Sequence, residues 1–288
     1  MRRTRTTIQA LVGATVIAGG MAALTPAAQA SAPTPIPVAC SENALVAAVN
    51  LANSTPAADT LILASGCIYH MTSAHGGGVL GDALPVITTP IEMIGPATIT
   101  RDSGLFRIAE VSKTGNLTLT TGVALTNGYA IGNGGGILNS GAVTLTGSSL
   151  SGNTASGNGG GLANADTPTG TAPAATFTNS PVSNNKAVSG NGGGIYNGVR
   201  GTLTTTGVSG SPLVITGNTG LRGGGIAAVN STATTLTQTA VTVNHAGITA
   251  GGVYRQGAGT MTTTNSPISA NTPTNCVGSS PAVPNCTG

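Results

Sequence analysis

A glycine-rich phrase returns five times along this chain of 288 residues, and no other feature constrains the fold as much. Each copy consists of consecutive glycines and an aliphatic residue: Gly134-Gly135-Gly136-Ile137, Gly159-Gly160-Gly161-Leu162, Gly192-Gly193-Gly194-Ile195, Gly223-Gly224-Gly225-Ile226 and the shorter Gly251-Gly252-Val253. Counted from the last glycine of each copy, the steps are 25, 33, 31 and 27 residues. Repeats of this length are typical of a solenoid, in which each unit buries its apolar face against its neighbours.

Most of the predicted coils also contain a triplet in which two threonines flank one apolar residue. The triplets are Thr118-Leu119-Thr120, Thr144-Leu145-Thr146, Thr176-Phe177-Thr178 and Thr235-Leu236-Thr237, with Thr262-Thr263-Thr264 in the last coil. Because side chains alternate along a strand, the central residue should point inward and the threonines outward. The Gly-Ile phrase predicts a second strand, and the short run before each recurring asparagine predicts a third.

We therefore expect an all-β fold: a single right-handed parallel β-helix with three short strands per coil and a short N-terminal capping helix. Neighbouring coils should stack about 4.8 Å apart. The right hand is expected because crossovers between parallel strands of one sheet are almost always right-handed.

Six asparagines recur at one phase of the repeat: Asn127, Asn153, Asn185, Asn218, Asn244 and Asn271. Asparagine tolerates left-handed backbone geometry, and its amide can bond the asparagine one coil away. We interpret the six as a structural ladder. The glycine triplets are not phosphate-binding loops, because no Gly-Lys-Ser/Thr ending and no long helix follow them.

The N-terminal region predicts export. Residues 1–30 have the features of a signal peptide: the basic Arg2, Arg3 and Arg5, an apolar stretch over 11–24, and the small residues Ala28 and Ala30 at a cleavage site. Residues 31–39 are expected to be a proline-rich tether, and 40–288 the β-helix domain. We expect the mature chain to be secreted, with no membrane span and as a monomer.

Both ends of the domain are expected to be capped. Ser41 predicts the N-cap of a helix with Leu45, Val46 and Val49 on its apolar face, within an N-terminal cap over 40–58. Early strands are expected over 60–63, 68–71, 91–94, 98–100 and 105–108, within coils over 59–270. The economical disulfides are Cys40–Cys67 and Cys276–Cys286, the second in a C-terminal cap over 271–288. Zinc binding is a weaker alternative, because no Cys-x-x-Cys spacing is present.

The charge of the chain argues against polyanionic partners. Ten Lys and Arg include the three arginines of the signal, which leaves seven basic residues against seven acidic ones. With 6% charged residues, the chain has no electrostatic footprint for nucleic acid or anionic lipid. The hydrophobic fraction is 39% and periodic, which favours a packed core. We expect no cofactor and no metal.

Several phrases carry a resemblance to known proteins: Cys40-Ser41-Glu42-Asn43-Ala44-Leu45, Leu105-Phe106-Arg107-Ile108, the repeated Gly-Gly-Gly-Ile, and Asn271-Thr272-Pro273-Thr274-Asn275-Cys276. On these, the chain resembles right-handed parallel β-helices of the pectate-lyase-like superfamily and, more narrowly, secreted β-helix repeat proteins of actinobacteria. The glycine phrases are also loosely similar to the repeats of polymorphic outer-membrane adhesins. The resemblance implies a fold and an export route, and no particular activity.

The acidic residues argue against a lyase or hydrolase site. Such enzymes need clustered carboxylates, either for calcium or as an acid/base pair, and only Asp166 of the seven acids lies within the repeats. Arg101 and Arg107, with Asp102 and Glu110, are expected to point outward as solvated ion pairs. The enzyme alternative is a diverged site for polysaccharide lysis or glycoside hydrolysis around Asp166, Lys186 and His245, with Tyr196 and Arg222 nearby. Lys186 and His245 should share a column two coils apart, about 10 Å.

Two surface patterns suggest binding instead. Tyr196 and Tyr254 should point outward in one column with Ala227 between them and Arg255 alongside, so that exposed rings stack sugars. The outward threonines form two columns that can order water, as in ice-binding solenoids, although threonine also suits any solvated strand. Our leading hypothesis is a secreted, non-catalytic β-helix that recognises a glycan, a cell-wall polymer or a protein. The alternatives are the diverged carbohydrate-active enzyme and a structural or ice-binding solenoid.

Overall fold

The computed structural model describes residues 35–77, 81–165 and 172–288, all within one compact unit, Pro33–Gly288. The predicted signal at 1–30 and Asp166 lie outside the described residues. Within these ranges the chain forms 28 strands and one helix, α1 (Glu42–Asn53). No helix in this part of the chain has the length and apolar character needed to cross a bilayer.

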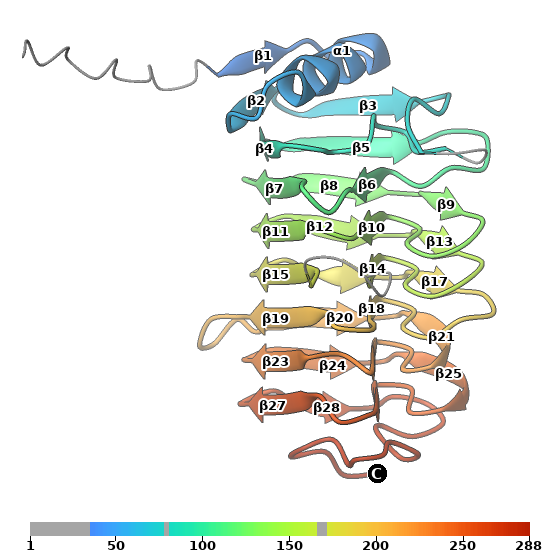
Figure 1. Ribbon diagram of the computed structural model, residues 1–288. Helices are drawn as coiled ribbons and strands as arrows, with labels where there is room; N and C mark the ends of the chain where they lie inside the picture. The colour runs from blue at the N-terminus through green and yellow to red at the C-terminus, as the bar shows by residue number, and fades with distance from the viewer. Residues whose placement is uncertain (1–34, 78–80, 166–171) are drawn as a thin grey trace, which may run out of the picture. The chain divides into compact units, whose positions relative to one another are not determined.

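The strands form four sheets that run along the stack of coils (Figure 1), and neighbouring strands are parallel in each. Sheet 1 contains, in spatial order, β1 (Ile36–Val38), β2 (Asp59–Leu63), β4 (Pro90–Ile94), β7 (Asn116–Thr120), β11 (Ala142–Thr146), β15 (Ala174–Thr178), β19 (Thr202–Thr206), β23 (Ala233–Thr237) and β27 (Thr260–Thr264). Sheet 2 contains β3 (Cys67–Met71), β5 (Ala97–Arg101), β8 (Val123–Thr126), β12 (Ser149–Ser151), β16 (Val182–Ser183), β20 (Leu213–Thr216), β24 (Thr239–Thr242) and β28 (Ile268–Ser269).

The two remaining sheets are shorter and begin after the first coils. Sheet 3 contains the short strands β9 (Tyr129–Ala130), β13 (Thr154–Ala155), β17 (Lys186–Ala187), β21 (Thr219–Arg222) and β25 (His245–Thr249). Sheet 4 contains β6 (Ala109–Val111), β10 (Ile137–Asn139), β14 (Leu162–Asn164), β18 (Ile195–Asn197), β22 (Ile226–Val229) and β26 (Val253–Gln256). The parallel β-helix is confirmed, and sheets 1, 2 and 4 contain the three predicted strands. Sheet 3 adds a fourth strand to five of the coils, which we did not predict.

The predicted alternation builds the core. Leu119, Leu145, Phe177 and Leu236 are fully buried in one column of sheet 1, while the threonines beside them face outward. Thr205 and Thr263 continue this column inside the core. Their hydroxyls are satisfied there, because Thr205 Oγ1 lies 2.8 Å from Thr239 Oγ1 and Thr263 Oγ1 donates to Pro284 O. The interior therefore accepts a threonine where a hydroxyl partner exists.

Helix α1 covers the N-terminal end of the stack (Figure 1). Ser41 is its N-cap, as predicted, and accepts a hydrogen bond from Ala44 N at 3.2 Å. The helix buries Leu45, Ala48, Val49 and Ala52, whereas Val46 is only partly buried. The predicted disulfides Cys40–Cys67 and Cys276–Cys286 are both present.

Two predicted boundaries at this end are wrong. Residues 36–38, assigned to the tether, form β1 and pair with β2, because Val38 packs into the core and its carbonyl accepts from the Tyr69 hydroxyl at 3.0 Å. The strand predicted over 105–108 lies instead at Ala109–Val111. Leu105 is half exposed, whereas Phe106 and Ile108 are buried in the core, so the run packs against the core without forming a strand.

The asparagine ladder is confirmed for five of its six predicted members. From Asn153 to Asn185, Asn218, Asn244 and Asn271, each side chain donates from Nδ2 to the Oδ1 of the next, at 2.9–3.0 Å. Asn127 is not a member. It pairs in register with Gly152, at a left-handed corner with φ +59, and Gly128 occupies the ladder position, donating its N–H to Asn153 Oδ1.

A second buried ladder escaped the sequence analysis. Asn139, Asn164 and Asn197 are fully buried and in register at the ends of β10, β14 and β18. Asn139 Nδ2 donates to Asn164 Oδ1 at 2.7 Å, Asn164 to Asn197 at 2.8 Å, and Asn197 to Thr234 Oγ1 at 2.9 Å. The signal was available, because each of these asparagines follows the last glycine of its triplet by three residues.

Candidate binding face

The outward side of sheet 1 carries two columns of threonines in register over six consecutive strands, β7, β11, β15, β19, β23 and β27. One column contains Thr118, Thr144, Thr176, Thr204, Thr235 and Thr262, and the other contains Thr120, Thr146, Thr178, Thr206, Thr237 and Thr264. We call these twelve residues the threonine face. Hydroxyls repeat about every 4.8 Å along the stack and about 7 Å across it.

The threonine face is uncharged along its length. A third outward column on the same strands holds Asn116, Ala142, Ala174, Thr202, Ala233 and Thr260, none of which ionises. Among the described residues of sheet 1, carboxylates lie beyond the N-terminal end of this face, where Glu92 is in register with Thr118 and Asp59 lies on β2. There they help to line a small cavity of about 190 Å³.

The threonine face is supported by the packed core beneath sheet 1. The buried Leu119, Leu145, Phe177 and Leu236 lie between the two threonine columns in sequence, and their packing fixes the pitch of the strands. β-Branched side chains such as threonine have few rotamers on a strand, so the hydroxyl positions are largely preset. Binding a periodic ligand here would cost little side-chain entropy.

The tyrosine column has the predicted register but not the predicted exposure. Tyr196, Ala227 and Tyr254 are in register on β18, β22 and β26. Tyr254 is only 8% exposed, its hydroxyl donates to Gln256 Oε1 at 3.0 Å, and Arg222 stacks 5.8 Å from its ring centroid. Tyr196 is partly buried against a small apolar cluster of Ala227, Ala250 and Tyr254, and burial raises the pKa of its phenol. The expectation of two exposed rings is therefore wrong, because the neighbouring coils cover Tyr254.

Arg255 is engaged within the fold. Its guanidinium donates to Gly259 O at 2.6 Å and to Ala282 O at 3.1 Å. These bonds connect the last strand of sheet 4 to the segment that carries the C-terminal disulfide. A side chain held by two backbone carbonyls has fewer donors left for a ligand.

The alternative catalytic residues come together only in part. Lys186, Thr219 and His245 are in register in sheet 3, so the lysine and the histidine lie two coils apart, as predicted. Both are exposed, and His245 Nδ1 lies 2.9 Å from Thr272 Oγ1. About 10 Å between them is too far for direct proton transfer.

A buried charged cluster was missed by the sequence analysis. Arg107 Nη1 contacts Asp82 Oδ1 at 2.5 Å and Glu110 Oε2 at 3.1 Å, with the Asp82 side chain fully buried and Arg107 only 14% exposed. Asp82 Oδ2 finds no hydrogen-bond partner among the described residues. The prediction that Arg107 is a solvated outward residue is therefore wrong, because the segment that contains Asp82 pairs alongside it in parallel and its carboxylate contacts the guanidinium.

The other early charges also have partners. Arg101 donates to Asn127 O and Gly104 O, both at 2.7 Å, and stacks 5.9 Å from the Tyr129 ring centroid. Asp102 is 43% exposed, as predicted, but it contacts His70 at 2.9 Å and not the predicted arginine partner. Arg101 connects its coil to the following coil through Asn127, and the His70–Asp102 contact connects the same coil to the preceding one.

Two carboxyl groups near the N-terminal cap have shifted pKa values of opposite sign. Burial raises the pKa of Asp82 to about 6 despite the opposing Arg107 charge, and the nearby Glu110 adds to the rise. Burial would also raise the pKa of Glu42, but hydrogen bonds from Thr72, His75 and Ser73 outweigh it and lower the pKa to about 2. Glu42 thereby joins the first turn of α1 to residues 72–75.

These shifts predict a stability maximum at mildly acidic pH. A lowered pKa means that the unfolded state binds the Glu42 proton more tightly, so stability falls as pH drops from 4.5 towards 2. A raised pKa has the opposite effect, so stability falls as pH rises from 3.8 to 6 through Asp82 ionisation. The expected optimum lies at about pH 4–5. The decrease on its alkaline side, the Asp82 limb, amounts to up to about 3 kcal/mol of unfolding free energy. The decrease on its acidic side, due to Glu42, is the acid limb.

Urea unfolding measured at several pH values tests this expectation. The Asp82→Asn variant should lose the decrease in stability between pH 4 and 6 and keep the acid limb, since asparagine does not ionise. Asp102→Asn is the matched control, because its carboxylate is 43% exposed, and it should keep both limbs. A decrease above pH 4 that persists in Asp82→Asn would contradict the assignment.

Within the described ranges, no three His, Cys, Asp or Glu side chains are grouped so that they could hold a metal ion. The structure thus provides an uncharged periodic face, a partly buried tyrosine column and a buried charge cluster near the cap. The chain matches no protein-family model, no curated protein and no solved structure.

Proposed function

We propose that this chain is an exported, non-catalytic binding protein whose threonine face recognises an extracellular polysaccharide. The observation that carries the proposal is the pair of threonine columns, in register over six strands with no ionisable residue among them. A hydroxyl both donates and accepts hydrogen bonds, so a periodic array of hydroxyls complements a polymer of repeating neutral hydroxylated rings.

Other features support export. Two disulfides at the ends of the domain suit an oxidising compartment. Residues 1–30 have the composition of a signal peptide. The pectate-lyase-like superfamily and the actinobacterial repeat proteins are the proposed relatives, on the phrases that carry the resemblance.

Cosedimentation with insoluble polysaccharides tests the proposal. Two variants, Thr146→Lys and Thr178→Lys, combined in one chain, should reduce retention about tenfold or more, since each lysine removes a hydroxyl and projects a charge over the face. The matched control combines Thr216→Lys and Thr242→Lys, which are also in register and partly exposed but lie on sheet 2. Equal loss in both variants, or no retention of the unaltered protein on any polysaccharide, would contradict the proposal.

The same array supports ice binding as a second candidate function. A flat repeat of threonine hydroxyls and methyl groups can order a layer of water on its surface, and this face has no charge to disturb such a layer. The unaltered protein should then inhibit ice recrystallisation, and the Thr146→Lys and Thr178→Lys variant should not. Inhibition without polysaccharide retention would favour this candidate, and retention without inhibition would exclude it.

A further inference from the structure

One corner of the β-helix departs from the repeat. The other connections from sheet 1 to sheet 2 are one to three residues long, such as residues 147–148 between β11 and β12. Between β19 and β20 it comprises residues 207–212. The coils on either side have no such extension, so this segment is an addition that the fold itself does not require.

The added segment has a defined conformation. Val208 and Ser211 pair with each other through two backbone hydrogen bonds, Val208 N to Ser211 O at 3.3 Å and Ser211 N to Val208 O at 3.0 Å. At its base, Gly207 N donates to Thr237 O and Leu213 N donates to Gln238 O, each at 3.0 Å. The segment therefore stands as a small hairpin fixed to the next coil.

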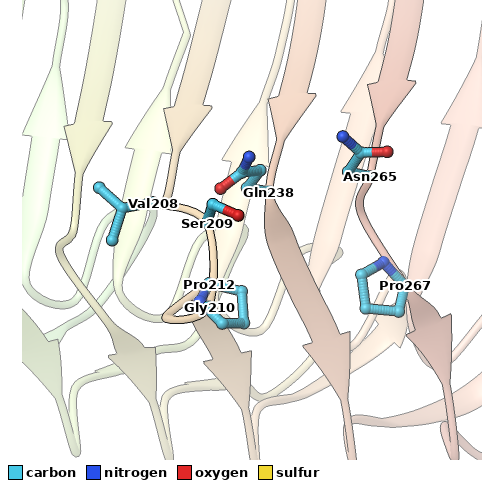
Figure 2. A pocket seen from close by; sticks show the side chains of 7 residues that line it. All are labelled: Val208, Ser209, Gly210, Pro212, Gln238, Asn265 and Pro267. Atoms are coloured by element: carbon cyan, nitrogen blue, oxygen red, sulfur yellow. The ribbon is translucent and has the colours of Figure 1, made fainter.

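The hairpin forms one wall of a cavity of about 290 Å³, which also involves the corners of the following two coils (Figure 2). The lining residues are Val208, Ser209, Gly210, Pro212, Gln238, Asn265 and Pro267. In Figure 2 the amides of Gln238 and Asn265 lie in the upper half and the rings of Pro212 and Pro267 in the lower half. None of the lining side chains ionises, so the cavity combines neutral polar groups with flat apolar walls.

One polar atom in a residue of the cavity wall lacks a partner. Gln238 Oε1 is buried and accepts no hydrogen bond from any group in the part of the chain that the structure describes. A buried acceptor without a donor costs about 1–3 kcal/mol, which a ligand in the cavity would recover only if the Gln238 side chain turned this oxygen towards it. Gln238 and Asn265 occupy equivalent corners of successive coils, and both have a left-handed backbone, with φ of +47 and +48.

We propose that this cavity is a binding site for a single neutral sugar ring. The amides of Gln238 and Asn265 and the Ser209 hydroxyl supply donors and acceptors for ring hydroxyls. Pro212 and Pro267 offer apolar surface to a ring face. The absence of charge in the lining selects against uronates, amino sugars and phosphates.

The site is distinct from the threonine face, although it adjoins its edge. Gly207, Gln238 and Asn265 each directly follow the last threonine of a sheet 1 strand, namely Thr206, Thr237 and Thr264. The inference goes beyond the proposed function, because binding of a free monosaccharide can occur whether or not a polymer binds the face. The two proposals can therefore fail separately.

Nuclear magnetic resonance of nitrogen-15-labelled mature protein tests the inference. The probes are the methyl glycosides of glucose, mannose, galactose and xylose, with glucuronate and glucosamine as charged counterparts. We expect the side-chain amide signals of Gln238 and Asn265 to shift with at least one neutral glycoside, with a Kd of about 1 mM. Shifts that are absent with every neutral glycoside, or equally large with the charged sugars, would overturn the proposal.

A variant pair locates the site. Gln238→Gly removes the side chain and keeps the left-handed corner, because glycine adopts that backbone freely, and it should weaken binding about tenfold. Asn179→Gly is the matched control, since Asn179 has φ +48 at the same corner two coils earlier and does not line the cavity. Unchanged affinity in Gln238→Gly would overturn the assignment of the site.

Discussion

The Gly193→Ala variant should fail to fold or lose more than about 4 kcal/mol of stability. A β-carbon at this position would lie 2.3 Å from the Thr219 carbonyl oxygen, 2.4 Å from its carbon and 2.5 Å from its nitrogen. All three atoms belong to the backbone of the next coil, which is held by the hydrogen bond from Thr219 N to Asn185 O at 2.9 Å. This steric clash could be relieved only if the two coils moved apart. Secreted yield and thermal unfolding measure the effect.

A glycine elsewhere in the coil provides the control for that variant. Gly147 has φ +59 and open space around it, and the equivalent corner of the next coil holds Asn179 with φ +48. Gly147→Asn should therefore cost less than about 1 kcal/mol, because asparagine accepts this backbone. Equal stability of Gly193→Ala and Gly147→Asn would show that coil-to-coil contact does not set the need for glycine.

The Asn185→Ala variant should lose about 3–6 kcal/mol of unfolding free energy. The Asn185 side chain accepts from Asn153 N and Asn153 Nδ2 at 2.9 and 3.0 Å, and donates to Leu150 O at 3.1 Å and Asn218 Oδ1 at 3.0 Å. Alanine leaves these buried groups without partners, and each costs about 1–3 kcal/mol. Urea unfolding monitored by circular dichroism measures the loss.

The neighbouring asparagine tests whether the ladder position matters. Asn184 is exposed with φ +55, and glycine stands at the equivalent positions, Gly152 and Gly217. Asn184→Gly should change stability by less than about 1 kcal/mol, because it removes no ladder bond. An Asn185→Ala variant as stable as Asn184→Gly would contradict the structural role of the ladder.

The periodic part of the fold was predictable because its signals repeat. Thr-x-Thr alternation predicted sheet 1 and the burial of Leu119 and Phe177, and the recurring asparagines predicted the ladder from Asn153 onward. Asn127 was misassigned because its spacing to the closing glycine allowed a slip of one residue. Only the register of β8 with β12 shows that Asn127 lies beside Gly152.

The features that depend on single contacts between distant segments were not predictable. Asp82 and Arg107 are 25 residues apart and meet because an irregular segment covers the arginine, which no local pattern records. The burial of Tyr254 likewise depends on a distant residue, Arg222, which stacks on its ring from the preceding coil. For the binding face, the sequence indicated outward threonines, whereas the cavity of the 207–212 hairpin arises from three coils together.

The most direct test of the central claim is an array of plant, fungal and bacterial polysaccharides probed with the mature protein, with product analysis on the same wells. We predict retention on at least one neutral polysaccharide and no release of reducing or unsaturated ends. Released products would contradict the claim that the protein binds without catalysis and would direct attention to Asp166, Lys186 and His245. If the protein is retained on no polymer and releases no products from any, polysaccharide recognition itself is contradicted.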